Sequence, residues 1–160
     1  MKAYAFLTIL LLSSGIISAQ TRIRQGDGTF LSNKVLLTLD ENKVRQGDGT
    51  ASWNTVLYTI DDNKIRQGDG TFLSNKVLLT IDGNKVRQGD GTASWNTVLY
   101  TIDGNMIRQG DGTFLSNTVL FTVNGEKISQ GDSTSFGKVI YTVEGEISTT
   151  LLAALLSLGF

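Results

Sequence analysis

Hydrophobic and polar residues alternate along this chain in short runs that are separated by turn residues. In the run VLYTI, which begins at Val98, every second residue is Val, Tyr or Ile, and the alternation resumes after an Asp-Gly-Asn turn. A two-residue period is that of a β-strand, whose successive side chains point to opposite faces. Two such runs around a turn of this composition predict a β-hairpin.

The turn residues suggest how each hairpin reverses direction. The second turn residue varies, whereas the third is Asn in four copies: Asn42, Asn63, Asn84 and Asn105. Asn tolerates the left-handed backbone conformation better than most side chains, so the pattern predicts that conformation at the Asn. Glu126 replaces the Asn in the fifth turn, which predicts a different turn geometry there.

The hairpin recurs with a period of 21 residues. Six glutamines in a Gln-Gly-Asp context mark the copies: Gln25, Gln46, Gln67, Gln88, Gln109 and Gln130. Residues 24–65 and 66–107 form two longer blocks that differ at only four positions. A fixed period of this length indicates a repeat architecture.

The connectors between hairpins alternate between Phe-Leu-Ser-Asn and Ala-Ser-Trp-Asn, and the strand residue that follows alternates in step between Leu and Tyr. Packed interiors tolerate little void, so we expect the connector aromatic and this strand residue to fill one shared volume. Trp53 and Trp95 are then predicted to pack in the core or between hairpins. The alternative, if they are exposed, is stacking on sugars.

Alternation also predicts which face of each hairpin is buried. In the second hairpin the predicted core face carries Val56, Tyr58, Ile60, Ile65 and Gln67. The predicted outer face carries Leu57, Thr59, Lys64 and Arg66.

One hairpin is only marginally stable, so successive hairpins must bury their apolar faces together, either in an open stack or in a closed ring. Unpaired single strands are predicted at the start, Thr21 to Gln25, and at the end, Val139 to Val143. Pairing of these two would close a circle. The sequence thus predicts an all-β fold, a closed ring of about six β-hairpin repeats.

The same motifs suggest a known family. Segments such as Tyr58-Thr59-Ile60-Asp61, Ile81-Asp82-Gly83 and Val86-Arg87, joined by small polar connectors, cover Thr21 to Ile147. This arrangement resembles the bacterial β-flower family, in which hairpin petals surround a shallow symmetric barrel. The resemblance implies a six-fold version of that fold. The family has no established activity, so the resemblance implies no function.

The two ends of the chain differ from the repeats. Residues 1–19 have the pattern of a signal peptide, with Lys2, an apolar run and small residues before Gln20, so we expect export to the periplasm, the outer surface or the medium. The repeat domain then covers residues 20–147. The apolar tail, residues 148–160, contains Leu151 to Phe160, LLAALLSLGF, and is predicted to form a short helix that plugs or caps the ring. The alternatives are contact with a membrane surface or a partner, and disorder.

Composition excludes several classes of function. The chain has no His, Cys or Pro, which excludes disulfides, imidazole or thiolate metal sites, and nucleophiles activated by His. The net charge is −1, so a nucleic-acid partner, which needs a basic surface, is not expected. Every polar residue of note is multiplied by the repeat, whereas catalytic sites are normally asymmetric. We therefore expect no enzyme and no cofactor.

Three sets of repeated polar residues are candidate sites. The six glutamines share the apolar face, so they predict a ring of buried amides that bond to one another or to a ligand. A rim that binds anions is suggested by five arginines, for which the alternative is a set of solvated residues partly paired with Asp: Arg24, Arg45, Arg66, Arg87 and Arg108. Calcium binding is conceivable at the aspartates of the connectors, although turn formation explains them better and we expect no metal: Asp27, Asp48, Asp69, Asp90, Asp111 and Asp132.

These observations predict a secreted or cell-envelope module that is not catalytic and binds a partner through the mouth or rim of its ring. The alternative is a self-assembling structural or adhesive protein, because Gln-Gly repeats of about this length superficially resemble curli-type fibre subunits. A closed ring would remain a monomer, whereas an open stack would expose strand edges and polymerise.

Overall fold

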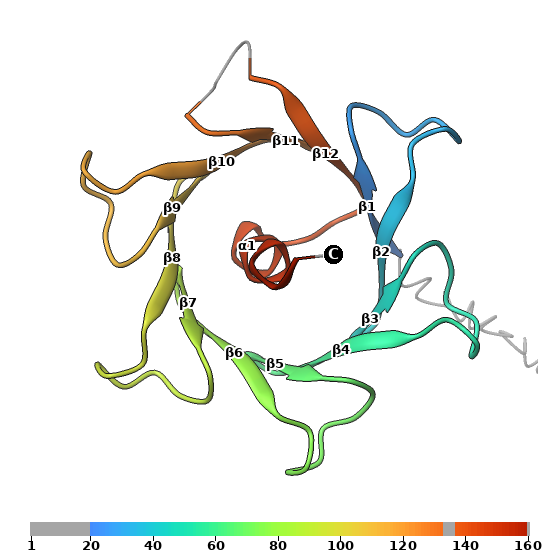
Figure 1. Cartoon of the computed structure of the whole chain (residues 1–160), viewed down its shortest axis with the longest axis horizontal. Coiled ribbons are helices and arrows are strands. Elements are labelled where there is room, and N and C mark those ends of the chain that lie inside the picture. Colours follow the sequence, from blue (N-terminus) through green and yellow to red (C-terminus); the bar gives the residue numbers. More distant parts are fainter. Residues whose placement is uncertain (1–19, 133–136, 160) are drawn as a thin grey trace, which may run out of the picture.

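The computed structural model describes residues 20–132 and 137–159, which form one closed antiparallel barrel around a single helix (Figure 1). The predicted signal peptide lies outside the described residues. The first five odd-numbered strands are each followed by a connector that projects outward as a petal, and the first five even-numbered strands each end in a tight turn (Figure 1). No helix among the described residues has the length and apolar composition needed to cross a bilayer.

Twelve strands make up the barrel. Five hairpins are formed by strands that are consecutive in the chain: β2 (Val35–Asp40) with β3 (Lys43–Gln46), β4 (Val56–Asp61) with β5 (Lys64–Gln67), β6 (Val77–Asp82) with β7 (Lys85–Gln88), β8 (Val98–Asp103) with β9 (Met106–Gln109), and β10 (Val119–Asn124) with β11 (Lys127–Gln130). The remaining pair joins the two ends of the repeat domain, β1 (Thr21–Gln25) and β12 (Val139–Glu144).

Pairing of β1 with β12 closes the ring and confirms the predicted circular arrangement. Ile23 lies opposite Val143, and the backbone N–H of Gly26 donates to the carbonyl of Ile140 over 2.7 Å. These two strands replace a hairpin whose halves lie at opposite ends of the sequence. As a result, every strand has a neighbour on both sides.

The interior of the barrel is filled by one layer of strand residues and by the C-terminal helix. Six β-branched side chains, one from each odd-numbered strand, are at most 2 % exposed: Ile23, Val44, Ile65, Val86, Ile107 and Ile128. Helix α1 (Thr149–Leu158) lies inside the ring, where Leu152, Ala153, Ala154 and Leu155 are buried (Figure 1). This position confirms the prediction that the tail plugs the ring. A ring of this many strands is wider than the roughly eight that strand side chains alone can fill.

Local sequence explains where α1 begins and ends. The hydroxyl of Ser148 accepts a hydrogen bond from the N–H of Leu151, which caps the first turn. Gly159 follows the last turn with a φ of 68°, a conformation that glycine adopts readily. The segment between these caps is apolar on almost every side, and inside a barrel all sides of a helix face side chains.

A β-bulge occurs wherever one hairpin pairs with the next. Val44 lies opposite Tyr58 while Arg45 lies opposite Val56, so Leu57 is the extra residue on its strand. The bulge lets both Leu57 and Tyr58 pack against the core. The prediction that Leu57 faces outward was therefore wrong, because simple alternation fails at an inserted residue.

The turns differ from the prediction. The left-handed residue is the second one, with a φ of 53° at Glu41, 55° at Asp62 and 60° at Gly125, and no Asn among the described residues has a positive φ. The fifth turn has the same left-handed second residue, so the expected change of geometry at Glu126 was also wrong. Asn instead joins neighbouring hairpins: the amide of Asn63 donates to the carbonyl of Ile81, whose N–H donates to the carbonyl of Asn63.

Truncation of the helix plug should destabilise the whole barrel. Leu155 is 1 % exposed, so we expect Leu155→Ala to lower the free energy of unfolding by about 2–5 kcal/mol, measured by urea denaturation. Leu31→Ala is the matched control, because Leu31 is fully exposed and its truncation should change the stability by less than about 0.5 kcal/mol. Equal effects of the two substitutions would contradict the assignment of the helix to the core.

The seam between β1 and the end of β12 requires a glycine. A Cβ on Gly145, whose φ is 99°, would lie 2.8 Å from the carbonyl oxygen of Gln20. We expect Gly145→Ala to lower the melting temperature more than Gly83→Ala, since Gly83 has a φ of 59° but open space around it. Thermal unfolding followed by circular dichroism compares the two variants, and an equal loss would show that the seam is not tightly packed.

Candidate functional site: the connector mouth and the petal tips

The barrel has two dissimilar openings. At the connector mouth, the odd-numbered strands end in their glutamines, and a hollow of about 450 Å³ is lined by Gln88, Leu78 and the C-terminal residues of α1, Ser157 and Leu158. At the turn mouth, where the hairpin turns lie, a smaller hollow of about 240 Å³ borders Glu126 and the first residues of α1. The helix axis therefore runs from the turn mouth to the connector mouth.

The six glutamines ring the connector mouth but are not buried. Gln67 lies opposite Tyr58, and Gln88 lies opposite Leu79, so these side chains follow the inner face as predicted. All six are nevertheless exposed, because each is the last residue of its strand. Within the described part of the chain, none bonds to another of the six. The predicted ring of buried amides was therefore wrong in its burial, since alternation indicates a face but not a depth.

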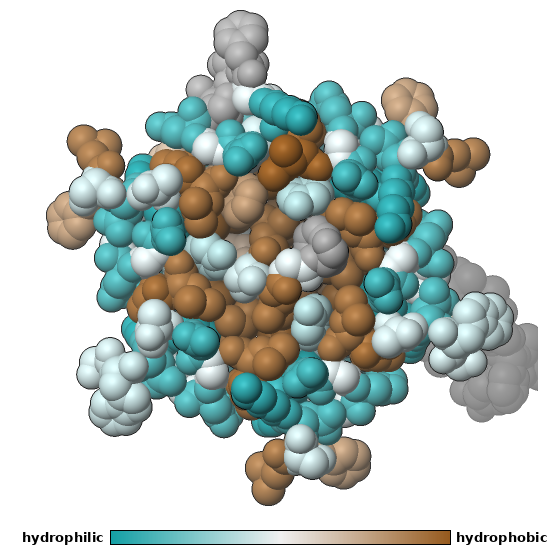
Figure 2. Space-filling model, in the orientation of Figure 1, coloured by the Kyte–Doolittle hydropathy of each residue, from teal (hydrophilic) through white to brown (hydrophobic). Residues whose placement is uncertain are grey.

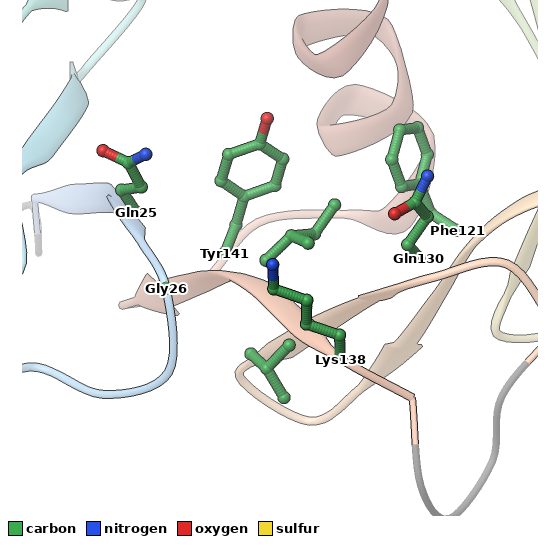
Figure 3. Close-up of a pocket in the computed structure, with 8 residues that line it drawn as sticks. Gln25, Gly26, Phe121, Gln130, Lys138 and Tyr141 are labelled. Atoms are coloured by element: carbon green, nitrogen blue, oxygen red, sulfur yellow. The ribbon is translucent and has the colours of Figure 1, made fainter.

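A second hollow of the connector mouth lies at the seam where the ring closes. Its volume is about 500 Å³, and its lining combines the amides of Gln25 and Gln130 with Phe121, Tyr141 and the ammonium of Lys138 (Figure 3). This lining offers apolar contact, amide hydrogen bonds and one positive charge. Burial raises the pKa of Tyr58, which lies opposite Gln67, above its usual value.

Four of the five repeated arginines are buried on the outer wall of the barrel. Arg66 is 8 % exposed; its Nε donates to Asp61 over 2.7 Å and its Nη1 to the carbonyl of Asn75 over 3.1 Å. Equivalent bonds to a carboxylate and to a connector carbonyl are made by Arg24, Arg87 and Arg108. The interpretation as solvated residues was wrong for these four, although the predicted pairing with carboxylates is present. Each guanidinium ties a petal to the barrel.

Arg45 departs from this pattern. Its Nη1 donates to the carbonyl of Asn54, but its buried Nε has no hydrogen-bond partner among the described residues. Asp40, which corresponds to Asp61 in the next hairpin, does not form an ion pair with it in the described structure. Arg45 borders a hollow of about 410 Å³ beside Trp53 on the second petal.

The connector aspartates link one hairpin to the next. Asp69 pairs with Lys43 over 2.9 Å and Asp90 with Lys64 over 2.7 Å, and all of these carboxylates are more than half exposed. The same link is made by Asp27, Asp48 and Asp111. Among the described residues, no group of three or more carboxylates is arranged to hold a metal ion.

The petal tips carry the most exposed apolar side chains of the described structure. Phe30 is 74 % exposed, Leu31 101 % and Trp53 86 %. We define the petal tips as eight residues: Phe30, Leu31, Trp53, Phe72, Leu73, Trp95, Phe114 and Leu115. Figure 2 shows apolar groups at the ends of petals around the edge of the molecule, separated by polar surface from the apolar centre.

The tips overturn one prediction. The connector aromatics do not share a volume with the strand residue that follows them: Tyr58 packs in the core, whereas Trp53 stands in solvent. The alternation of Phe and Trp connectors therefore reflects two kinds of petal and not two ways of filling the core. The sequence did contain a signal for this exposure. Each aromatic lies within a connector rich in Gly, Ser and Asn, which is the composition of an exposed loop.

Comparison with known proteins agrees with this geometry. A family model described as 6-fold beta flower protein matches residues 19–156, which include every strand and most of α1. No curated protein and no solved structure matches the chain. The match covers most of the sequence and describes the same six-fold ring of hairpins. The chain therefore belongs to the 6-fold beta flower family.

Proposed function

We propose that the protein is a secreted or cell-envelope interaction module that is not catalytic and binds its partner through the petal tips. The observation that carries this proposal is the exposure of large apolar side chains on five successive petals. Binding residues are disproportionately found on exposed loops that a rigid scaffold holds in position, as these connectors are.

Energetics support a role of the tips in binding. Burying one Leu or Phe side chain contributes roughly 1.5–3 kcal/mol. The tips gain little of this in the isolated barrel, because they are between 74 % and 101 % exposed. Folding therefore does not explain them, whereas a partner that covers several tips at once would recover a large part of this free energy. Petals held by buried arginines present the tips on a firm support.

The polar residues support a role other than catalysis. The glutamines, arginines and connector aspartates each recur around the ring in equivalent settings. The connector mouth brings amides and apolar side chains together, with one ammonium at the seam. This chemistry suits contact with a partner better than a covalent reaction, which needs distinct groups in one place.

The closed ring disfavours the alternative of a fibre subunit. Polymerisation through strand addition requires an edge with unpaired N–H and C=O groups. In the described barrel each strand pairs on both sides, including β1 and β12 at the seam. We therefore propose a monomer whose contacts come from the petals.

Export is part of the proposal and can be tested directly. When the full chain is expressed in a bacterial host, we expect the protein outside the cytoplasm to begin at Gln20, because residues 1–19 have the pattern of a cleaved signal peptide. Intact-mass measurement of the exported protein identifies the cleavage site. Recovery of the full-length chain from the cytoplasm alone would contradict this part of the proposal.

The petal tips themselves can be tested by substitution in that host. We expect the wild-type protein to sediment with the isolated cell envelope, and the six-fold variant F30S/L31S/F72S/L73S/F114S/L115S to remain soluble, because the partner loses its apolar anchors. The matched control S32A/S74A/S116A changes the same three petals and should sediment like the wild type. Circular dichroism should show that both variants fold. Equal sedimentation of all three proteins would contradict binding through the tips.

A further inference from the structure

We propose that the surface bound by the petal tips is an anionic lipid bilayer, which the protein meets with its connector mouth. This inference rests on the proposed function and specifies its partner. It follows from two independent observations, the distribution of charges that have no partner within the protein and the arrangement of the tips.

Most charges of the described barrel are neutralised in pairs. Nine ion pairs, with N···O distances from 2.6 to 3.0 Å, each join one basic and one acidic side chain. These pairs add no net charge to either mouth of the ring. The field outside the protein is therefore determined by the few charges that remain.

The remaining cations gather at the connector mouth. Lys76 and Lys138 border the two hollows of that mouth, and Lys34 occupies the position in its petal that Lys76 occupies two petals later. All three side chains are exposed, and none forms an ion pair with a described residue. Lys34 and Lys76 lie only three residues beyond Leu31 and Leu73 of the tips. The fourth unpaired cation, Arg45, is on the outer wall.

The remaining anions gather at the opposite end. Glu41 and Asp62 are the left-handed residues of two hairpin turns, and Glu126 and Glu146 line the hollow of the turn mouth. All four are exposed and none is in an ion pair with a described residue. Asp40 lies on the wall, and Asp132 is the one unpaired carboxylate on a connector. The unpaired side-chain charges are therefore mainly positive at the connector mouth and negative at the turn mouth, so only the former complements an anionic surface.

The tips suit a bilayer better than a folded partner. They are apolar groups held apart on separate petals, and Figure 2 shows polar surface between them. A protein partner would need a separate pocket at each of these positions, whereas a bilayer accepts apolar groups anywhere on its surface. Trp and Phe favour the region between headgroups and acyl chains. Stable attachment to a membrane generally combines such anchors with basic residues, and both are present here.

The bilayer contact has to come from the petals because the apolar tail is already buried inside the ring as α1. Leu152 and Leu155 of α1 are each 1 % exposed inside the ring, and Ala153 and Ala154 are fully buried. Attachment through α1 would require the core to open, whereas attachment through the tips leaves the barrel unchanged.

Tryptophan fluorescence can report on this contact. Its only two tryptophans, Trp53 and Trp95, are both petal tips and are 86 % and 85 % exposed. We expect their fluorescence to shift to shorter wavelength when the mature protein meets vesicles of phosphatidylglycerol and phosphatidylcholine in equal amounts. Vesicles of phosphatidylcholine alone should cause a smaller shift, and added NaCl should reverse part of the binding. Brominated acyl chains should quench the bound protein.

Charge position is tested by three variants in a flotation assay with the same vesicles. We expect K34Q/K76Q/K138Q to bind more weakly by roughly fivefold for each lysine removed. E41Q/D62N/E126Q changes the net charge by the same amount in the opposite direction, but at the turn mouth, and should bind about as tightly as the wild type. The variant that combines both sets has the wild-type net charge and should still bind weakly. Equal binding by the combined variant and the wild type would overturn the proposed orientation.

The outcomes separate this inference from the proposed function. If the purified protein shows no fluorescence shift with either vesicle, while the serine variant still loses its sedimentation with the cell envelope, the lipid inference is wrong and the tips bind an envelope protein or glycan. A fluorescence shift caused by soluble oligosaccharides but not by vesicles would likewise overturn it in favour of stacking on sugars. Loss of vesicle binding in F30S/L31S/F72S/L73S/F114S/L115S, with retention in S32A/S74A/S116A, would support it.

Discussion

Filling the space inside the ring is the constraint on which the rest of the structure depends. Twelve short strands enclose more volume than one layer of their own side chains occupies, and a dry interior cannot remain partly empty at low cost. Helix α1 supplies the missing atoms, and it is apolar on almost every side because the ring surrounds it. The barrel in turn supplies the burial without which a ten-residue helix would be marginal in water.

Closure of the ring places the chain ends where they can serve this purpose. The strand that follows Gln20 pairs with β12, and the chain then turns at Gly145, where there is no room for a side chain, and enters the bore as α1. A hairpin divided between the two ends also removes the free edges of an open stack. The outer wall is held by a separate set of repeated contacts, in which buried arginines, threonines and Asn amides join hairpins to their petals and to neighbouring hairpins.

The sequence predicted the architecture well because the architecture follows from periodicity. The bounds of β1, the pairing of the two ends and the location of the tail all follow from the alternation, the spare strands and the need to bury LLAALLSLGF. It predicted details poorly wherever one residue breaks the period. Leu57 faces inward because a bulge interrupts the alternation, and the glutamines are exposed because their strands end at the mouth. Trp53 illustrates a further limit, since a large aromatic residue in a repeat is not necessarily a core residue.

The fit between helix and ring restricts how such a protein can change in size. The two nearly identical blocks, residues 24–65 and 66–107, indicate that pairs of hairpins have been copied as units. In a linear solenoid another copy would simply lengthen the molecule. Here each added pair would enlarge the circumference of the closed ring and open a gap around α1. The number of hairpins is therefore coupled to the thickness of a single helix. A hairpin pair can replace an older pair by duplication, but the total number of hairpins in the ring must stay the same.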